Sequence, residues 1–268
     1  DKHMNDKFYE LLDRTGFVFL DGGFGTMLQA TGVEIGHNPE LLNITNPDVI
    51  MNIHRQYVES GSDIFCANTF GANSYKLKNS GYTVAEVVSA GIAIAKKAAS
   101  GKALVALDIG PIGQLLEPSG TLTFEEAYEI HKETVLAGAD ADIIIIETMT
   151  DLYEVKAALL AAKENSDKPV LVTMTYEANM RTFTGVSPEC ATAVLEGLGA
   201  DAVGVNCSLG PDELLPIIEK ICANTTLPVI AKPNAGLPDP VTNKFNVTPE
   251  QFAQSAVKLA ELGVKIFG

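Results

Sequence analysis

The stretch Asp142-Ile-Ile-Ile-Ile-Glu-Thr148, together with the helical pattern of Asp151–Glu164 that follows it, decides the fold class. A short uninterrupted apolar run is typical of a strand that is buried on both faces of a parallel sheet. Asp151 is a suitable N-cap for the next helix, because its carboxylate can accept a hydrogen bond from the free amides of the first turn. The stretch therefore predicts one βα unit of an α/β protein.

The same unit recurs along the chain, and its repetition predicts a (β/α)8 TIM barrel. Eight apolar runs have the length and composition of strands: Phe17–Leu20, Asp63–Cys66, Ala103–Leu107, Asp142–Ile146, Pro169–Thr173, Asp201–Val205, Pro228–Ala231 and Val264–Phe267. Seven stretches between them have helical periodicity: Pro47–Ser60, Thr83–Ala99, Thr123–Leu136, Asp151–Glu164, Ser187–Leu198, Pro211–Ala223 and Thr248–Leu262. We expect residues 1–268 to form one barrel domain, with residues 1–4 outside the fold because they resemble a cloning remnant.

A doubly wound open sheet is the structural alternative. It is disfavoured because no glycine fingerprint for a dinucleotide follows the first run, Phe17–Leu20. The eighth run ends at Phe267–Gly268, before the loop and helix that should follow it. We therefore expect a barrel that is truncated after strand 8, with part of its functional face outside this sequence.

The bulk composition indicates a soluble, cytoplasmic protein. The longest apolar runs, such as Ile143–Ile146, are too short to cross a bilayer, and the N-terminus lacks the order of a secretory signal. A formal charge of −15 argues against a nucleic-acid surface, which needs basic clusters. The four cysteines have no paired spacing, so we interpret them as reduced core residues or metal ligands.

Polar residues gather directly after the predicted strands. They are Asp21-Gly22-Gly23, Asn68-Thr69, Asp108, Glu147-Thr148, Thr173, Thr175, Asn206-Cys207, Lys232 and Asn234. In a barrel the carboxyl ends of the strands share one mouth, so these loops converge. The carboxylates of Asp21 and Glu147, with the backbone amides of Gly22 and Gly23, suit a zwitterionic amino acid. The alternative is that both acids only cap helices or satisfy loop amides.

Cys207 is the only cysteine that we place at the carboxyl end of a strand. Cys66 falls inside the second predicted strand, and Cys190 and Cys222 fall in helices, where a buried inert thiol is usual. No histidine follows a barrel strand, which disfavours a histidine-rich metal site and a Ser-His hydrolase. The histidines are interpreted as solvated or packed: they are His3, His37, His54 and His131.

Taken together in chain order, the motifs resemble the homocysteine S-methyltransferase family, and most closely its cobalamin-dependent methionine synthase type. The resemblance covers essentially the whole chain. The motifs that carry it are Leu20–Thr26, Pro39–Asn43, Gly61–Asp63, Asn68–Ala72, Asp108–Pro111, Glu147–Thr148, Gly204–Pro211 and Pro233–Pro238. Each motif is weak alone, and their shared order makes the signal specific.

The resemblance implies a catalytic zinc ion held by three cysteines. One matches Cys207, and two adjacent ones follow strand 8 in a segment of which this sequence contains only the first glycine, Gly268. The zinc site is therefore expected to be incomplete, because catalytic zinc usually has three protein ligands and one open position. Homocysteine would bind in that open position as a zinc thiolate, ready to attack a methyl group and yield methionine.

The resemblance also implies the roles of the surrounding residues. Asp21 and Glu147 would bind the amino group, and the Gly22–Gly23 backbone and Thr69 would lie near the carboxylate. Asn234 would be a provisional metal ligand when substrate is absent, and Asn206 would orient its loop. Lys232 is interpreted first as a salt-bridged residue.

The methyl donor is left open by the sequence, with methylcobalamin favoured over betaine and S-methylmethionine. A cobalamin donor would be bound elsewhere, on cobalamin- and folate-binding modules in the same chain or in a partner chain. Two other function classes stay open from the residues alone. One is a lyase in which Lys232 forms a Schiff base. The other is a binding module without catalysis.

Overall fold

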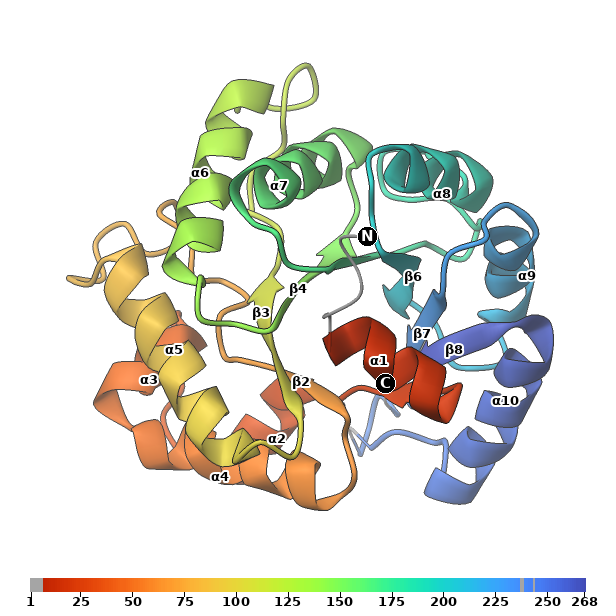
Figure 1. Ribbon diagram of the computed structural model, residues 1–268, viewed down its shortest axis with the longest axis horizontal. Helices are drawn as coiled ribbons and strands as arrows, with labels where there is room; N and C mark the ends of the chain where they lie inside the picture. The colour runs from red at the N-terminus through yellow and green to blue at the C-terminus, as the bar shows by residue number, and fades with distance from the viewer. Residues whose placement is uncertain (1–6, 237–238, 243) are drawn as a thin grey trace.

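Eight parallel strands surround a central axis in the computed structural model, which describes residues 7–236, 239–242 and 244–268 (Figure 1). The strands are β1 Val18–Phe19, β2 Ile64–Cys66, β3 Leu104–Ile109, β4 Ile143–Met149, β5 Val170–Met174, β6 Ala202–Cys207, β7 Val229–Pro233 and β8 Val264–Phe267. They pair in the order β1-β8-β7-β6-β5-β4-β3-β2, and a parallel bridge between Leu20 and Ile64 joins the two ends of that order. This arrangement confirms the predicted (β/α)8 barrel.

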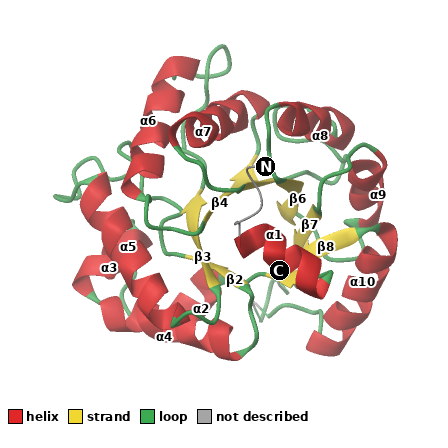
Figure 2. Ribbon diagram, viewed as in Figure 1, coloured by secondary structure: helices red, strands yellow, loops and turns green. Residues whose placement is uncertain are grey.

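Helices form the outer layer around the strands, except for α1, which lies across the centre of the ring (Figure 2). Their bounds are α1 Lys7–Thr15, α2 Phe24–Ala30, η1 Pro39–Leu41, α3 Leu42–Thr45, α4 Pro47–Glu59, α5 Val84–Ala99, α6 Phe124–Ala137, α7 Leu152–Asn165, α8 Pro188–Gly197, α9 Leu215–Ala223 and α10 Pro249–Leu262. Capping boxes open α5, α6 and α10, where Thr83, Thr123 and Thr248 accept hydrogen bonds from the third residue of each helix. Within the described ranges, none of the helices is long and apolar enough to cross a membrane.

The predicted helices lie close to the observed ones, with one clear correction. We predicted a helix from Pro211, but residues 211–214 form a turn and α9 begins at Leu215, with Pro216 in its first turn. Four elements outside the predicted repeats were missed, namely α1, α2, η1 and α3. These elements lie before β1 or in the long connection to α4, where the helical pattern is short.

Helix α1 closes the amino-terminal end of the barrel. It lies across the centre of the ring in Figure 1, and its side chains Phe8 and Leu11 are buried with the inward apolar residues of the strands. A second apolar core fills the layer between the strands and the outer helices. Helix α1 therefore covers the inward apolar residues at this end, opposite the mouth formed by the carboxyl ends of the strands.

Several strands extend further toward this mouth than the sequence predicts. Strand β3 extends to Ile109, β4 to Met149, β6 to Cys207 and β7 to Pro233. The predicted strands ended with the apolar runs, yet the backbone ladder continues through polar residues that face the mouth. Several candidate site residues therefore stand on rigid strand ends and not on loops.

Candidate active site

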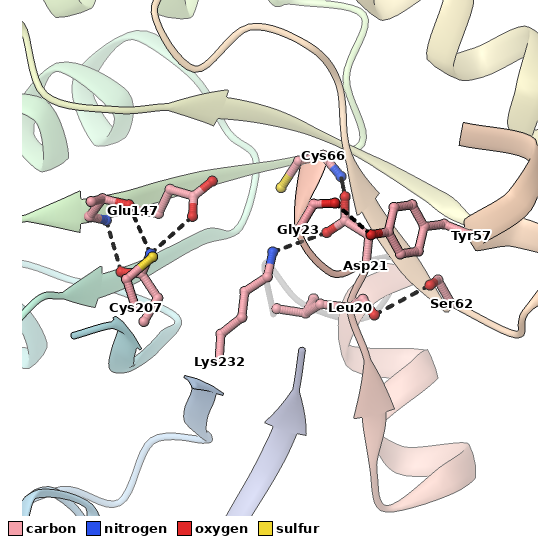
Figure 3. A network of polar contacts seen from close by, with 11 residues as sticks. Leu20, Asp21, Gly23, Tyr57, Ser62, Cys66, Glu147, Cys207 and Lys232 are labelled. Carbon is pink, nitrogen blue, oxygen red and sulfur yellow. Dashed lines mark hydrogen bonds and ion pairs between the residues drawn. The ribbon is translucent and has the colours of Figure 1, made fainter. Parts of the chain in front are cut away.

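Asp21 follows β1 and lies at the buried centre of the mouth. Its side chain is 3% exposed, Oδ1 accepts a hydrogen bond from Lys232 Nζ at 3.1 Å, and Oδ2 accepts one from the Cys66 amide at 3.1 Å. Figure 3 shows both contacts converging on the carboxylate. Burial raises the pKa of Asp21, and the ammonium of Lys232 opposes that rise. Asp21 therefore connects the ends of three strands.

Lys232, on β7, places its ammonium among the acidic groups of the mouth. Figure 3 shows its side chain rising between Asp21 on one side and Glu147 and Cys207 on the other. Although burial alone would lower it, the negative charges of Asp21 and Glu147 raise the pKa of Lys232 well above its ordinary value. A Schiff-base nucleophile must be a neutral amine, so this environment opposes the lyase interpretation.

Asn206 links the ends of β4 and β6. Its Nδ2 donates to Glu147 Oε2 at 3.1 Å and to Thr148 Oγ1 at 2.8 Å. Its Oδ1 accepts from the Thr148 amide at 2.9 Å and from Thr173 Oγ1 at 2.8 Å. Thr148 and Cys207 both have left-handed backbones, with φ of 60° and 54°, a conformation that non-glycine residues rarely adopt. The Asn206 side chain thus connects Glu147 with the end of β6, where Cys207 lies.

Cys207 is exposed at the end of β6, beside the loop that follows β7. Desolvation and the nearby Glu147 carboxylate raise the pKa of the Cys207 thiol, so the protein groups alone favour its protonated form. Asn234 is half-buried. Its backbone N–H donates to the Leu209 carbonyl at 3.1 Å, which joins the loop after β7 to the loop after β6. Cys207, at the end of β6, and Asn234, directly after β7, therefore lie at one side of the mouth, where Cys207 pairs with Pro233.

The Gly22–Gly23 backbone lies directly beside Asp21. Tyr57 Oη donates to the Gly23 carbonyl at 2.8 Å, and a Cβ on Gly22 would lie 3.1 Å from that hydroxyl. Close packing against Tyr57 is the physical reason for a side chain no larger than hydrogen at Gly22. Thr69 is buried, and its hydroxyl donates to the Asp108 carbonyl at 2.9 Å and accepts from the Asp108 amide at 3.0 Å.

Cys66 lies in β2 and is buried, as predicted, but it is the last residue of that strand, so Cys207 is not the only cysteine at a strand's carboxyl end. The Cys66 sulfur lies within 4.8 Å of carboxylate oxygens of Asp108 and Glu147. Burial and the Asp108 carboxylate raise the pKa of the Cys66 thiol well above its usual range. Cys190 and Cys222 do lie in helices, but Cys190 is exposed and Cys222 is half-buried, so neither is the buried thiol that we expected.

Asp108 is the residue of the mouth whose importance the sequence argument missed. It lies near the end of β3 and is 6% exposed, and burial and the Glu147 carboxyl group raise its pKa well above the usual range. Asp108 belongs to the polar set at the strand ends, but nothing in the sequence separates it from its neighbours there. Its distinguishing feature is its closeness to Glu147, which only the three-dimensional arrangement reveals.

Comparisons with known proteins agree with this architecture. The profile of the family described as homocysteine S-methyltransferase matches residues 18–268. Methionine synthase from Mycobacterium tuberculosis (strain ATCC 25618 / H37Rv) is 33% identical over 297 residues, which covers 100% of this chain and 24% of that protein. Methionine synthase from Mycobacterium leprae (strain TN) is 32% identical over 275 residues, covering 92% of this chain and 22% of that protein. The chain thus spans about a quarter of the length of these relatives.

Solved structures show the same fold. The oxidized form of the homocysteine methyltransferase MmuM from Escherichia coli superposes with a TM-score of 0.85 at 19% identity, covering 98% of this chain and 94% of that chain. Its metallated form gives a TM-score of 0.83 at 20% identity, covering 97% and 93% of the two chains. The fold, the order of the motifs and the match over residues 18–268 lead to one assignment: the chain belongs to the homocysteine S-methyltransferase family.

Proposed function

We propose that this chain binds homocysteine at the barrel mouth and presents its thiol for methylation to methionine. The observation that carries the proposal is the convergence of Asp21, Glu147 and Cys207 on one mouth, linked by Lys232 and Asn206. Family membership supplies the reaction class, and the mouth supplies groups that complement an amino acid with a sulfur at its far end. The domain that performs this function would be the whole of residues 1–268.

The substrate would lie across the mouth with its two ends in different surroundings. Its ammonium group would face the carboxylates of Asp21 and Glu147, because charge-assisted hydrogen bonds are stronger than neutral ones. Its carboxylate would lie against the amides of Gly22 and Gly23, with Thr69 nearby. Its sulfur would then extend toward Cys207 and Asn234. Asn206 would keep the ammonium end and the sulfur end in fixed relation through its contacts with Glu147 and the β6 end.

A zinc ion is the metal that the family resemblance implies for the sulfur end. In this chain Cys207 would be a thiolate ligand and Asn234 a provisional one, and the family's two adjacent cysteines would lie beyond Gly268. The surroundings fit a cation, since Glu147 contributes negative charge beside the Cys207 thiol. When bound, zinc lowers the pKa of a coordinated thiol, so that the thiol loses its proton at neutral pH.

Methylcobalamin is the donor that we propose, held by cobalamin- and folate-binding modules in the same chain or in a partner chain. The methionine synthase relatives support this choice, because they are about four times as long as the chain and contain further sequence. A betaine- or S-methylmethionine-dependent methyltransferase is the second candidate, because the family resemblance leaves the methyl donor open. Both candidates share the thiol-activating half of the reaction.

Calorimetric titration with homocysteine, with and without zinc, tests the proposal. We expect the chain as given to bind zinc weakly, and a version extended through the two further cysteines to bind one zinc and to methylate homocysteine with free methylcobalamin. In the extended chain, Cys207→Ser should lose zinc and activity, whereas Cys190→Ser, at an exposed helical cysteine, should keep both. Tight zinc binding by the short chain, or full activity of Cys207→Ser, would show that the ligand assignment is wrong.

A further inference from the structure

Asp108 carries a buried carboxyl oxygen that the other described residues do not satisfy. The residue is 6% exposed, and its Oδ1 has no hydrogen-bond partner among residues 7–236, 239–242 and 244–268. Burying a polar atom without a partner is costly, so such atoms in native proteins usually await a ligand, an ion or a water. The Thr69 hydroxyl forms hydrogen bonds with both the carbonyl and the amide of Asp108, which hold the backbone of this strand end in place.

The Asp108 carboxyl group lies beside Glu147, in the region of the proposed amino-group site. Carboxylate oxygens of Asp108 and Glu147 and the Cys66 sulfur all lie within 4.8 Å of one another. Two carboxyl groups at this separation repel each other when both are charged, and a positive group between them removes the repulsion. The arrangement therefore favours a cationic ligand that touches Asp108 and Glu147 together.

An ammonium group fits this place. Burial and the nearby Asp108 raise the pKa of the Cys66 thiol, the third group of the cluster, so the negative charge of the cluster comes from its carboxyl groups. The molecule already directs one ammonium into the same region, since Lys232 Nζ lies 3.1 Å from Asp21 Oδ1 and its charge is felt by Asp108. The carboxyl groups of Asp21, Glu147 and Asp108 therefore already surround one ammonium group, that of Lys232.

The number of acceptors matches the chemistry of a primary ammonium, which donates three N–H bonds. Asp21 and Glu147 supply two acceptors, but Asp21 already accepts bonds from Lys232 and Cys66, and Glu147 accepts one from Asn206. Asp108 Oδ1 accepts no hydrogen bond from the described residues, so it is available as the acceptor for the third N–H.

We propose that Asp108 binds the substrate's ammonium group together with Glu147 and Asp21, and that this third carboxyl group restricts the site to primary amines. The inference rests on the proposed function and deepens it, because it adds a specificity-determining residue to the homocysteine site. A secondary amine presents one N–H fewer and a methyl group in its place, so it would leave one buried acceptor unsatisfied. An analogue without the amino group would gain nothing from Asp108.

The test is a pair of titrations with the extended, zinc-loaded chain. One uses L-homocysteine, and the other uses 4-mercaptobutyrate, which keeps the thiol and the carboxylate but has no amino group. We expect Asp108→Asn to weaken homocysteine binding about 10-fold or more and to change 4-mercaptobutyrate binding little. Asp201→Asn, at a buried aspartate near the opposite end of the barrel, is the matched control and should leave the ratio of the two affinities unchanged.

A second measurement uses the unaltered chain and so does not depend on the folding of a variant. N-methylhomocysteine should bind about 10-fold more weakly than homocysteine. Equal binding of these two ligands, or equal losses of homocysteine and 4-mercaptobutyrate in Asp108→Asn, would overturn the role of Asp108. If the unaltered chain fails to prefer homocysteine over 4-mercaptobutyrate, the proposed amino-acid site itself is wrong. The two failures are therefore distinguishable.

Discussion

Single side chains connect parts of the mouth that are distant in sequence. Asn206 is the clearest case, because its one amide group contacts Glu147, Thr148 and Thr173 from two other strands. The left-handed backbones at Thr148 and Cys207 cost free energy, and such conformations persist where surrounding contacts hold them. The strain therefore lies at the point where the proposed amino and sulfur ends of the substrate meet the protein.

Glu147→Gln should weaken homocysteine binding while leaving the fold intact. The change keeps an oxygen that can accept from Asn206 but removes the charge that would pair with the substrate's ammonium. We expect a loss of about 1.5–3 kcal/mol, which is about 10-fold to 150-fold in Kd. Calorimetric titration gives the affinity and thermal melting checks the fold. Glu125→Gln, at an exposed position on α6, should bind as the unaltered chain does, and an unchanged affinity in Glu147→Gln would rule out the ammonium contact.

His54 should make the protein less stable in mild acid. It packs between Phe24 and Phe65, and burial lowers the pKa of His54 from 6.5 to about 4. Between these values the unfolded chain binds a proton that the folded chain excludes. Above pH 6.5, His54 is neutral in both the folded and the unfolded chain, and the stability is at its full value. As the pH falls from 6.5 toward 4, the free energy of unfolding decreases by about 1.4 kcal/mol per pH unit.

The measurement is the free energy of unfolding in urea at several pH values between 4 and 7. His54→Leu should flatten the fall in stability over this range, because the group that takes up the proton is gone. His37→Leu, at an exposed histidine, should leave the slope as it is. The same slope in His54→Leu as in the unaltered chain would contradict the assignment.

At the scale of elements, the sequence predicted which segments are strands better than where they end. The eight apolar runs coincide with β1 to β8, because burial on both faces leaves an uninterrupted signal. The carboxyl ends of β3, β4, β6 and β7 were placed too early, because there the strands continue through polar residues that line the mouth. The closeness of Asp108 to Glu147 could not be predicted, since it depends on the register between β3 and β4.

Gly204 in β6 should not accept even one added methyl group. A Cβ built on it would lie 1.9 Å from the carbonyl oxygen of Ile230 on the neighbouring strand β7. We expect Gly204→Ala to lower the free energy of unfolding by about 3 kcal/mol or more, because the clash involves backbone that cannot move alone. Gly197→Ala in α8 is the matched control: nothing lies within 4 Å of its Cβ, so it should be neutral or slightly stabilising. Urea unfolding curves give the free energy of unfolding of both variants, and equal values for the two would contradict the predicted clash.

Over the whole molecule, the two ends of the barrel differ in structure: one is covered by a helix, and the other holds the candidate site. At the amino-terminal end, Phe8 and Leu11 of α1 pack on the inward apolar residues of the strands, whereas the carboxyl-terminal end holds the buried polar groups of the candidate site. This division predicts that stability and binding can be changed separately, in line with other barrels of this kind. The (β/α)8 architecture could be predicted from the sequence, but helix α1 could not. Its nine residues precede the first strand and are not part of a repeating βα unit.

Phe8→Ala should destabilise the barrel and spare the mouth. The Phe8 side chain, on α1, is 0% exposed and packs against the inward residues of the strands. Truncating a buried phenylalanine lowers the free energy of unfolding by about 3–5 kcal/mol. Homocysteine affinity should stay unchanged under conditions where the variant is folded, because the site lies at the other end. Phe183→Ala, at a side chain that is 62% exposed, should shift stability by about 0.5 kcal/mol or less. A stable Phe8→Ala protein would show that α1 does not seal the floor.

The pairing of β1 with β8 has a consequence for how the chain reaches its native state. Val18 aligns with Ile266, so the earliest strand finds its main partner only in the last one, and its link to β2 is a single bridge. On the ribosome, a nascent chain that lacks β8 has two open sheet edges and an α1 without a complete docking surface. Such edges are templates for aggregation. The nascent barrel is therefore a natural client for chaperones until its final strand has emerged.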